Sequence, residues 1–410
     1  IEIKAKEKGY PLYLIIDEYD NFTNVILSEH GQQMFHDLTH ASGFYREYFK
    51  QFKGMFDRIF MMGVSPVTLD DLSSGYNIDW NISVDPRFNA MMGFDETEVR
   101  EMFHYYQQND MLNGDVEAMI AEMKPWYDNY CFARKSLDDD RVFNCDMTLY
   151  YLRWQVDFHR APEEMVDKNI RTDYSKLKML ARIDRDSVQE GDRMSTIEKI
   201  AAEGDIFVDL HTSFPAERIT DIDNFRSLLY YYGLLTMCGT RGDLIKMSIP
   251  NNCVREQYFG FLRDYYQKYS SIDLHYLNVM LTDMAYDGRW KPFFESVAQA
   301  YRENSAVRDA MEGERNLQGF LKAYLALASY YLVEPELEMN YGYCDFFLLP
   351  DKKRYPDVKH SYILELKYAT RTATDAELEV QALEGRNQLL QYSEDKIVRC
   401  LSEGTTLHRL

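Results

Sequence analysis

Two apolar runs in the last quarter of the chain constrain its fold most strongly, because each places charged residues inside strand-like sequence. They read YGYCDFFLL at 341–349 and YILELKY at 362–368. Side chains alternate between the two faces of a strand, so Glu365 and Lys367 share one face. If the two runs pair as a hairpin, Asp345 comes to lie beside Glu365. We therefore expect two carboxylates and one ammonium group to meet in an apolar sheet.

Such a cluster is stable only if its charges are paired or bind a cation, because carboxylate and ammonium groups are costly to remove from water. A divalent cation such as Mg²⁺ takes oxygen ligands and also binds phosphate. Asp345 and Glu365 are therefore candidate metal ligands. The alternative is an edge hairpin whose Glu and Lys face solvent, and the residues leave both possibilities open.

Helices are expected on both sides of these runs. Residues 376–395 have the composition of a helix. Before the runs, apolar residues recur at helical spacing after Glu314. These residues are Leu317, Phe320, Leu321, Tyr324, Leu325, Ala328 and Tyr331.

A second chemical signature lies at 10–20, YPLYLIIDEYD, an apolar strand that ends in acids. This is the form of a Walker B element, whose strand is buried in a parallel sheet. Asp17 would hold the Mg²⁺ of ATP and Glu18 would polarise the attacking water. The alternative is a buried strand followed by an acidic turn.

A second buried strand is expected at 58–67, with Ser65 as the candidate that senses the γ-phosphate. Residues 28–57 between the strands favour a helix. Strand, helix and strand in this order are typical of a doubly wound parallel sheet. No G-x-x-x-x-G-K-[ST] loop occurs, and the chain begins at Ile1 without a Met. We expect that this sequence is a fragment and that the loop lies upstream; the alternative is a protein that never had one.

Several segments together resemble one family. They are DEYDNF at 17–22, GVSPVTLDDL at 63–72, WYDNY at 126–130, RSLLYYYGLLT at 226–236 and IPN at 249–251. In this order they are similar to bacterial AAA-ATPase-like proteins fused to a carboxy-terminal PD-(D/E)XK nuclease domain. The resemblance covers nearly the whole chain, and the missing phosphate loop is its one departure.

The resemblance implies an α/β fold in three parts. Residues 1–95 would be the remainder of an AAA-like P-loop ATPase core with a parallel sheet. Residues 96–300 would be a helical lid and connector. Residues 301–410 would be a restriction-endonuclease-like α/β domain with the core order helix, hairpin, helix.

The resemblance also implies roles for the site residues. Asp345 and Glu365 would hold one or two Mg²⁺ or Mn²⁺ ions, and Lys367 would position or activate the attacking water. Glu314 on the preceding helix would face the site, and Gln388 on the following helix matches better than Gln391. The alternatives are that Glu314 is a first-turn acid favoured by the helix dipole and that Gln388 is a solvated polar residue.

The function that follows is an ATPase-coupled, divalent-metal-dependent nuclease with DNA as the expected substrate and ATP bound by the full-length protein. The alternatives are a non-catalytic binding or regulatory module, and an ATP-driven switch with an inactive nuclease fold. Whether the site is an active enzyme, and whether the protein forms oligomers, stay open.

Composition sets outer limits on these functions. A net charge of −21 argues against a general nucleic-acid coat, although residues 301–410 carry 14 Lys and Arg against 18 Asp and Glu, only −4. The six cysteines are scattered, which favours free thiols in a reducing cytoplasm. The longest apolar runs are of strand length, so no membrane span is expected.

Overall fold

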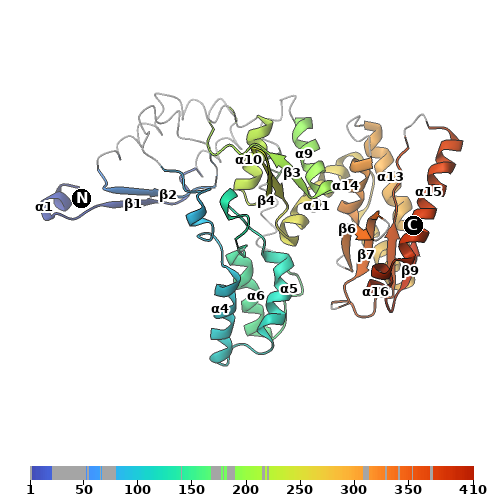
Figure 1. Cartoon of the computed structure of the whole chain (residues 1–410), viewed down its shortest axis with the longest axis horizontal. Helices are drawn as coiled ribbons and strands as arrows, with labels where there is room; N and C mark the ends of the chain where they lie inside the picture. Colours follow the sequence, from blue (N-terminus) through green and yellow to red (C-terminus); the bar gives the residue numbers. More distant parts are fainter. Residues whose placement is uncertain are drawn as a thin grey trace. The chain divides into compact units, whose positions relative to one another are not determined.

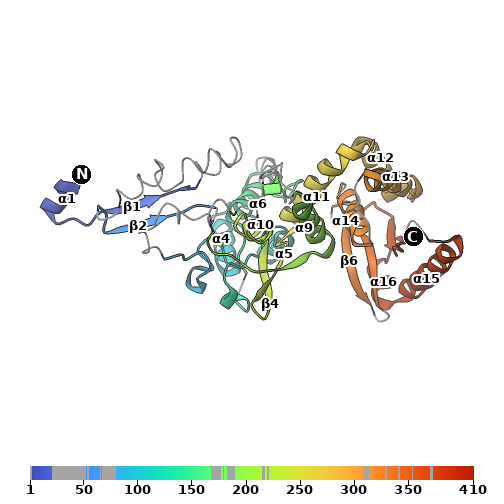
Figure 2. The same cartoon turned by 90° about the horizontal axis from the view of Figure 1, so that it is seen from above.

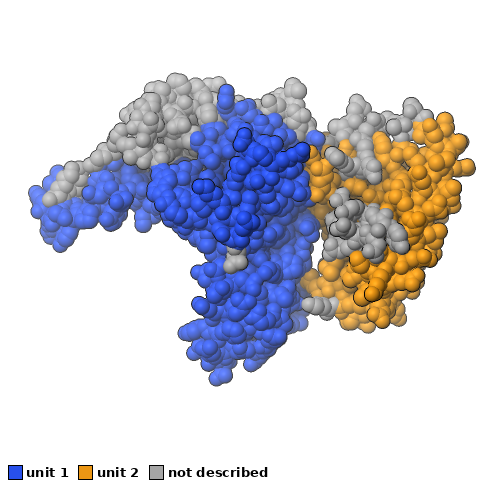
Figure 3. All heavy atoms as spheres, in the orientation of Figure 1, with its two compact units in different colours: residues 1–196, 204–257 blue, residues 197–203, 258–410 orange. Residues whose placement is uncertain are grey.

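The structure of the chain is a computed structural model (Figure 1). It describes residues 2–20, 52, 55–64, 66, 80–139, 141–167, 177–178, 180–181, 190–214, 218, 221–307, 314–327, 330–339, 342–352, 354–369 and 373–410. Two compact units are present, Ile1–Thr196 with Gly204–Gln257 and Ile197–Glu203 with Tyr258–Leu410 (Figure 3). The three-part division expected from the sequence stays a prediction.

After helix α1 (Glu2–Lys8), the strands β1 (Tyr13–Ile16) and β2 (Arg58–Met61) of the first unit form a parallel two-stranded sheet. The parallel pairing of the two strands is as expected. The helix expected at 28–57 between them falls almost entirely outside the residues that the structure describes. The expected burial is wrong for the strands, because Tyr13 and Ile15 on β1 are 64% and 70% exposed. Full burial of a parallel strand needs neighbours on both edges and covered faces, and among the described residues β1 has only β2 as a partner strand.

Helices are the main regular elements of the first unit after residue 95, where the sequence predicted a helical region. Asp95 caps α4 in a capping box with Glu98, whose side chain accepts from the Asp95 amide. The described elements of this unit are α1 (Glu2–Lys8), β1 (Tyr13–Ile16), β2 (Arg58–Met61), η1 (Pro86–Phe88), α4 (Glu96–Gln108), α5 (Val116–Tyr127), η2 (Arg134–Ser136), α6 (Cys145–Phe158), β3 (Asp205–Val208), α10 (Ile222–Tyr231), β4 (Thr236–Arg241) and β5 (Leu244–Ser248). Helices α9 (Glu190–Glu203) and α11 (Asn252–Tyr266) contribute to both units.

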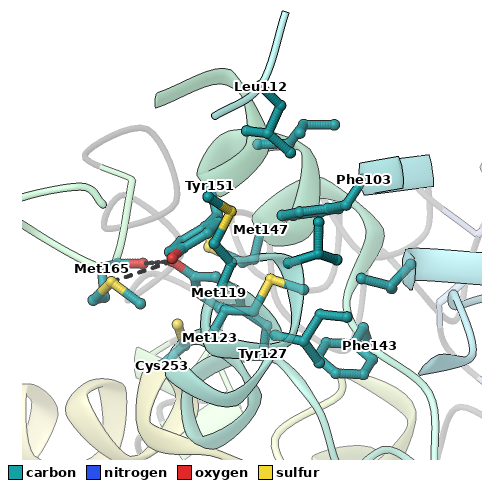
Figure 4. Close-up of a cluster of buried hydrophobic side chains, with 14 of the residues drawn as sticks. Phe103, Leu112, Met119, Met123, Tyr127, Phe143, Met147, Tyr151, Met165 and Cys253 are labelled. Carbon is teal, nitrogen blue, oxygen red and sulfur yellow. Dashed lines mark hydrogen bonds between the residues drawn. The ribbon is translucent and has the colours of Figure 1, made fainter. Parts of the chain in front are cut away.

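A hydrophobic cluster joins α4, α5 and α6 (Figure 4). Phe103, Tyr127 and Tyr151 are fully buried in it, and the Tyr127 hydroxyl donates to the Met165 carbonyl at 2.7 Å. Each aromatic side chain buries a large apolar area, and aliphatic and Met side chains fill the rest of the cluster. Strands β3, β5 and β4 form an antiparallel sheet in that order. Strand β5 (Leu244–Ser248) ends two residues before Pro250.

The second unit is built around a four-stranded sheet in the order β6-β7-β8-β9. Neighbouring strands are antiparallel except β8 and β9, which are parallel. Its remaining elements are η4 (Gln267–Tyr269), α12 (Leu274–Asp287), α13 (Lys291–Val307), α14 (Glu314–Leu325), β6 (Tyr331–Met339), β7 (Gly342–Pro350), β8 (His360–Leu364), α15 (Asp375–Glu394), α16 (Lys396–Leu401) and β9 (Thr406–Arg409). Within the described residues, no helix has the length and apolar character needed to cross a bilayer.

Successive residues of β8 contact different helices. The Tyr362 hydroxyl donates to the Met284 carbonyl on α12 at 2.6 Å. Ile363 instead packs with Leu389 of α15 and Val398 of α16. Because neighbouring strand residues point to opposite faces, α12 covers one face of the sheet and α15 with α16 cover the other (Figures 1 and 2).

Three expectations for this unit can be compared with the structure. The antiparallel pairing of the two apolar runs is confirmed by β7 and β8. A helix at 376–395 is confirmed by α15. The assignment of Tyr331 to the preceding helix is wrong, because α14 ends at Leu325 and Tyr331 pairs with Pro350 at the start of β6.

Candidate functional site

The register of β7 and β8 brings the expected carboxylates together. Phe346 pairs with Leu364 and Phe347 with Ile363. One further step in this register sets Asp345 opposite Glu365. Glu365, however, lies just beyond β8, which ends at Leu364. The strand expected over 362–368 is therefore too long. The Glu365 amide donates to the Leu410 carbonyl and the Leu366 amide donates to the Asp345 side chain, so neither continues the pairing with β7.

Asp345 is held by two donors from different parts of the chain. Its Oδ2 accepts from the Leu366 backbone N–H at 2.5 Å, and its Oδ1 accepts from Nε2 of Gln318 on α14 at 2.9 Å. Hydrogen bonds to a carboxylate are among the stronger ones in proteins. They fix the orientation of a side chain that is only half-buried.

Glu365 and Lys367 form an ion pair beside Asp345. Lys367 Nζ lies 2.9 Å from Glu365 Oε1, and the two side chains are 30% and 7% exposed. The second oxygen of Glu365, Oε2, is buried and has no hydrogen-bond partner among the described residues. A buried oxygen without a donor is unfavourable, so this atom is available to an additional ligand.

Burial and the neighbouring charges act on the pKa of Glu365 in both directions. Burial raises the pKa of the Glu365 carboxyl, and the neighbouring Asp345 charge raises it further, whereas the hydrogen bond from Lys367 lowers it. The balance leaves the pKa of Glu365 above its ordinary value. Two carboxylates at one place disfavour each other's charged forms unless a cation lies between them.

One face of α15 lines the site. Gly385, Gln388 and Tyr392 follow each other at helical spacing of three and four residues. A Cβ on Gly385 would lie 3.5 Å from Lys367 Cγ and 3.8 Å from Glu365 Cγ. Gln388 Oε1 is buried without a hydrogen-bond partner among the described side chains. Burial raises the pKa of Tyr392, and the Glu365 charge raises it further, which shows that this ring is near the same carboxylate.

Substitutions of Gly385 test how large a side chain fits between α15 and the Glu365–Lys367 pair. Gly385→Ala is expected to raise the free energy of unfolding by about 0.5–1 kcal/mol, because its contacts are ordinary and helical Gly is unfavourable. Gly385→Leu is expected to lower it by about 1–3 kcal/mol through overpacking against Lys367. Urea unfolding measures both, and destabilisation by Ala would contradict the contact geometry.

The remaining residues expected near this site are less informative. Glu314 is the first residue of α14, but its side chain lies outside what the structure describes. Gln391 is exposed, whereas Gln388 is half-buried with its oxygen enclosed. The roles of all these residues stay predictions.

The candidate nucleotide residues lie in the first unit. Asp17 and Glu18 follow β1 and are exposed, and the Glu18 amide donates to Asp17 Oδ1 at 2.9 Å. Asp20 is buried and accepts from the Val64 amide at 3.1 Å and 3.2 Å, which ties the end of β1 to the segment after β2. Ser65 lies outside the described residues. Nucleotide binding by Asp17, Glu18 and Ser65 stays a prediction.

Sequence reasoning missed three residues of the carboxylate site: Gln318, Gly385 and Tyr392. Helical spacing offers a signal for each of them. Gln318 is four residues after Glu314, and Tyr392 is four residues after Gln388, so each pair shares a helix face. Gly385 precedes Gln388 by three residues.

The donor set fits a hard divalent cation. Asp345, Glu365 and Gln388 offer only oxygen atoms, the ligands that Mg²⁺ and Mn²⁺ prefer. Glu365 Oε2 and Gln388 Oε1 are both buried and lack partners within the described set. Only two carboxylates meet here, and no group of three or more His, Cys, Asp or Glu side chains able to hold a metal occurs in the part of the chain that the structure describes.

Fold and site together give an α/β domain in which a mixed sheet lies between helices, with paired carboxylates and a lysine at one strand end. Two family models match the chain. The PD-(D/E)XK nuclease superfamily matches residues 312–409, and a family described as "Predicted AAA-ATPase" matches residues 1–73. The chain thus carries an AAA-ATPase-like segment and a PD-(D/E)XK nuclease domain, as its motifs suggested. Neither a curated protein nor a solved structure matches it significantly.

Proposed function

We propose that residues 312–409 form a divalent-metal-dependent nuclease that hydrolyses phosphodiester bonds, with DNA as its substrate. The observation that carries the proposal is the meeting of Asp345, Glu365 and Lys367 at one strand end, with a buried carboxylate oxygen left without a partner. The match to the nuclease superfamily over the same residues supports it.

Asp345 and Glu365 would hold Mg²⁺ or Mn²⁺. When bound, such an ion would polarise the phosphodiester and lower the pKa of a water molecule. Glu365 suits this role because its Oε2 is enclosed and unpartnered, and because burial, together with the nearby Asp345 charge, raises the pKa of a carboxylate that a cation would stabilise in its charged form. Asp345 suits it because two hydrogen bonds already fix its carboxylate.

Lys367 would act on the substrate. Its ammonium group pairs with Glu365 Oε1 at 2.9 Å yet keeps 30% of its side chain exposed. A cation in this position can orient water and stabilise negative charge that develops on the phosphate. Gln388, across the site on α15, offers a further buried oxygen for holding the ion or orienting water.

The proposal is tested by incubating the protein with linear and circular DNA, and with RNA, in the presence of Mg²⁺, Mn²⁺ or EDTA. We expect cleavage that requires the metal and falls by at least about 10²-fold in Asp345→Asn and Lys367→Met. If the protein neither cleaves any of these substrates nor binds either ion, the proposal is wrong. Metal or DNA binding without cleavage would favour the non-catalytic module.

We further propose that the AAA-ATPase-like segment couples ATP to the nuclease in the full-length protein, with Asp17 and Glu18 as its Mg²⁺-binding and water-polarising acids. Their place directly after an apolar strand supports this. ATP hydrolysis by the full-length protein that disappears in Glu18→Gln is the expected result. Hydrolysis without any nuclease activity would favour a switch with an inactive nuclease fold.

A further inference from the structure

Gln318 lies outside every motif of the sequence, yet it contacts the proposed metal ligand directly. Its Nε2 donates to Asp345 Oδ1 at 2.9 Å from α14, while the Leu366 amide donates to Oδ2 at 2.5 Å. Asp345 is therefore held from both sides, by a helix that precedes the sheet and by the chain that leaves β8.

The helix that carries Gln318 is firmly packed. One turn after Gln318, the buried Lys322 ammonium donates to the Ala202 carbonyl of α9. Gly319 lets α14 approach closely, because a Cβ there would lie 3.4 Å from both the Ala202 Cβ and the Glu198 carbonyl oxygen. Phe320 is fully buried. The backbone of Gln318 is thus fixed by contacts that do not involve the site.

We propose that Gln318 is a positioning residue that sets the orientation of Asp345 for the divalent cation; this inference rests on the proposed function. Each carboxylate oxygen has two lone pairs. The Gln318 amide takes one on Oδ1 and the Leu366 amide takes one on Oδ2, so one on each oxygen remains for the ion. Rotation of Asp345 away from the site would break both hydrogen bonds.

The chemistry of the donor matters as much as its position. A neutral amide leaves the full negative charge on Asp345, whereas a lysine or arginine here would compete with the cation for it. Donors that hold metal-ligating carboxylates typically change metal affinity by about 10–100-fold when they are removed. Gln318 is expected to act through metal affinity, and the reaction at saturating metal is expected to be little changed.

The decisive variant is Gln318→Met, which keeps the length of the side chain and removes the N–H donor. We expect its dissociation constant for Mn²⁺, measured by calorimetry or electron paramagnetic resonance, to rise about 10–100-fold. Hydrogen exchange of the Leu366 amide in the metal-free protein should become faster. The rate of DNA cleavage at saturating Mn²⁺ should stay within about threefold of wild type.

Gln391→Met is the matched control, because Gln391 is an exposed glutamine on α15. It should bind Mn²⁺ like the wild type. Gln318→Asn, whose amide is one methylene too short to reach, should weaken binding as Gln318→Met does and serves if the Met variant does not fold. Wild-type Mn²⁺ affinity in a folded Gln318 variant, or equal weakening in the control, would overturn the inference. A wild-type protein that binds no Mn²⁺ would overturn the proposed function itself, and this inference with it.

Discussion

Glu365→Gln is expected to reduce metal-dependent cleavage by roughly 10³-fold, the scale on which removal of one preorganised electrostatic group slows an enzyme. Glutamine keeps the shape of the side chain but removes the charge that would hold the cation. The same change should leave the protein folded, because burial and Asp345 raise the pKa of Glu365 and its ionised form is unfavourable there. Cleavage assays measure the loss of activity, Mn²⁺ titration measures the loss of cation binding, and thermal unfolding measures whether the protein stays folded.

Glu384→Gln provides the control for this variant. Glu384 is an exposed residue of α15, immediately before Gly385, and its substitution should change neither activity nor metal affinity. A Glu365→Gln protein that cleaves at the wild-type rate would contradict the assignment of this carboxylate. Loss of activity with an equal loss of fold would show that the pair with Lys367 serves stability instead.

Leu389→Ala is expected to destabilise the second unit by about 2–5 kcal/mol, because it removes a buried side chain and leaves a cavity. Leu389 is 7% exposed and packs with Phe347, Ile363 and Val398 beneath the carboxylate site. Denaturant unfolding monitored in the second unit measures the change. Mn²⁺ affinity should fall with it, since α15 holds Gln388 against the site.

The neighbouring residue gives a control with the same chemistry. Leu390 is 50% exposed on the other side of α15, and surface substitutions of this kind usually change stability by less than about 0.5 kcal/mol. Leu390→Ala should therefore unfold like the wild type. Equal destabilisation by the two substitutions would mean that α15 does not pack on the sheet through Leu389.

Local sequence patterns were sufficient to predict the strands and the helix that carry the candidate site. The two apolar runs predicted the antiparallel pairing that sets Asp345 near Glu365, and the composition of 376–395 predicted α15 to within a residue or two. Both signals depend on neighbours in sequence. They also led to the nuclease family, which the match over 312–409 supports.

Contacts between distant segments could not be read in this way. Strand β9, Thr406–Arg409, has the polar sequence TLHR and becomes a strand only because β8 pairs with it. Tyr331 continues a helical pattern but belongs to β6, because backbone pairing with β7 outweighs that pattern. The donors to Asp345 come from positions 27 and 21 residues away. Only the helical spacing of Gln318 from Glu314 gives a local signal for one of them.

The pairing of β9 has a practical consequence for handling the protein. The Glu365 amide donates to the Leu410 carbonyl at 3.0 Å, and the Leu410 amide donates to the Ile363 carbonyl at 2.9 Å. The backbone next to the acidic pair is thus stapled by residues 45 positions downstream. Deletions or affinity tags at 406–410 would disturb the backbone beside the proposed metal site, so affinity tags are better placed elsewhere on the molecule.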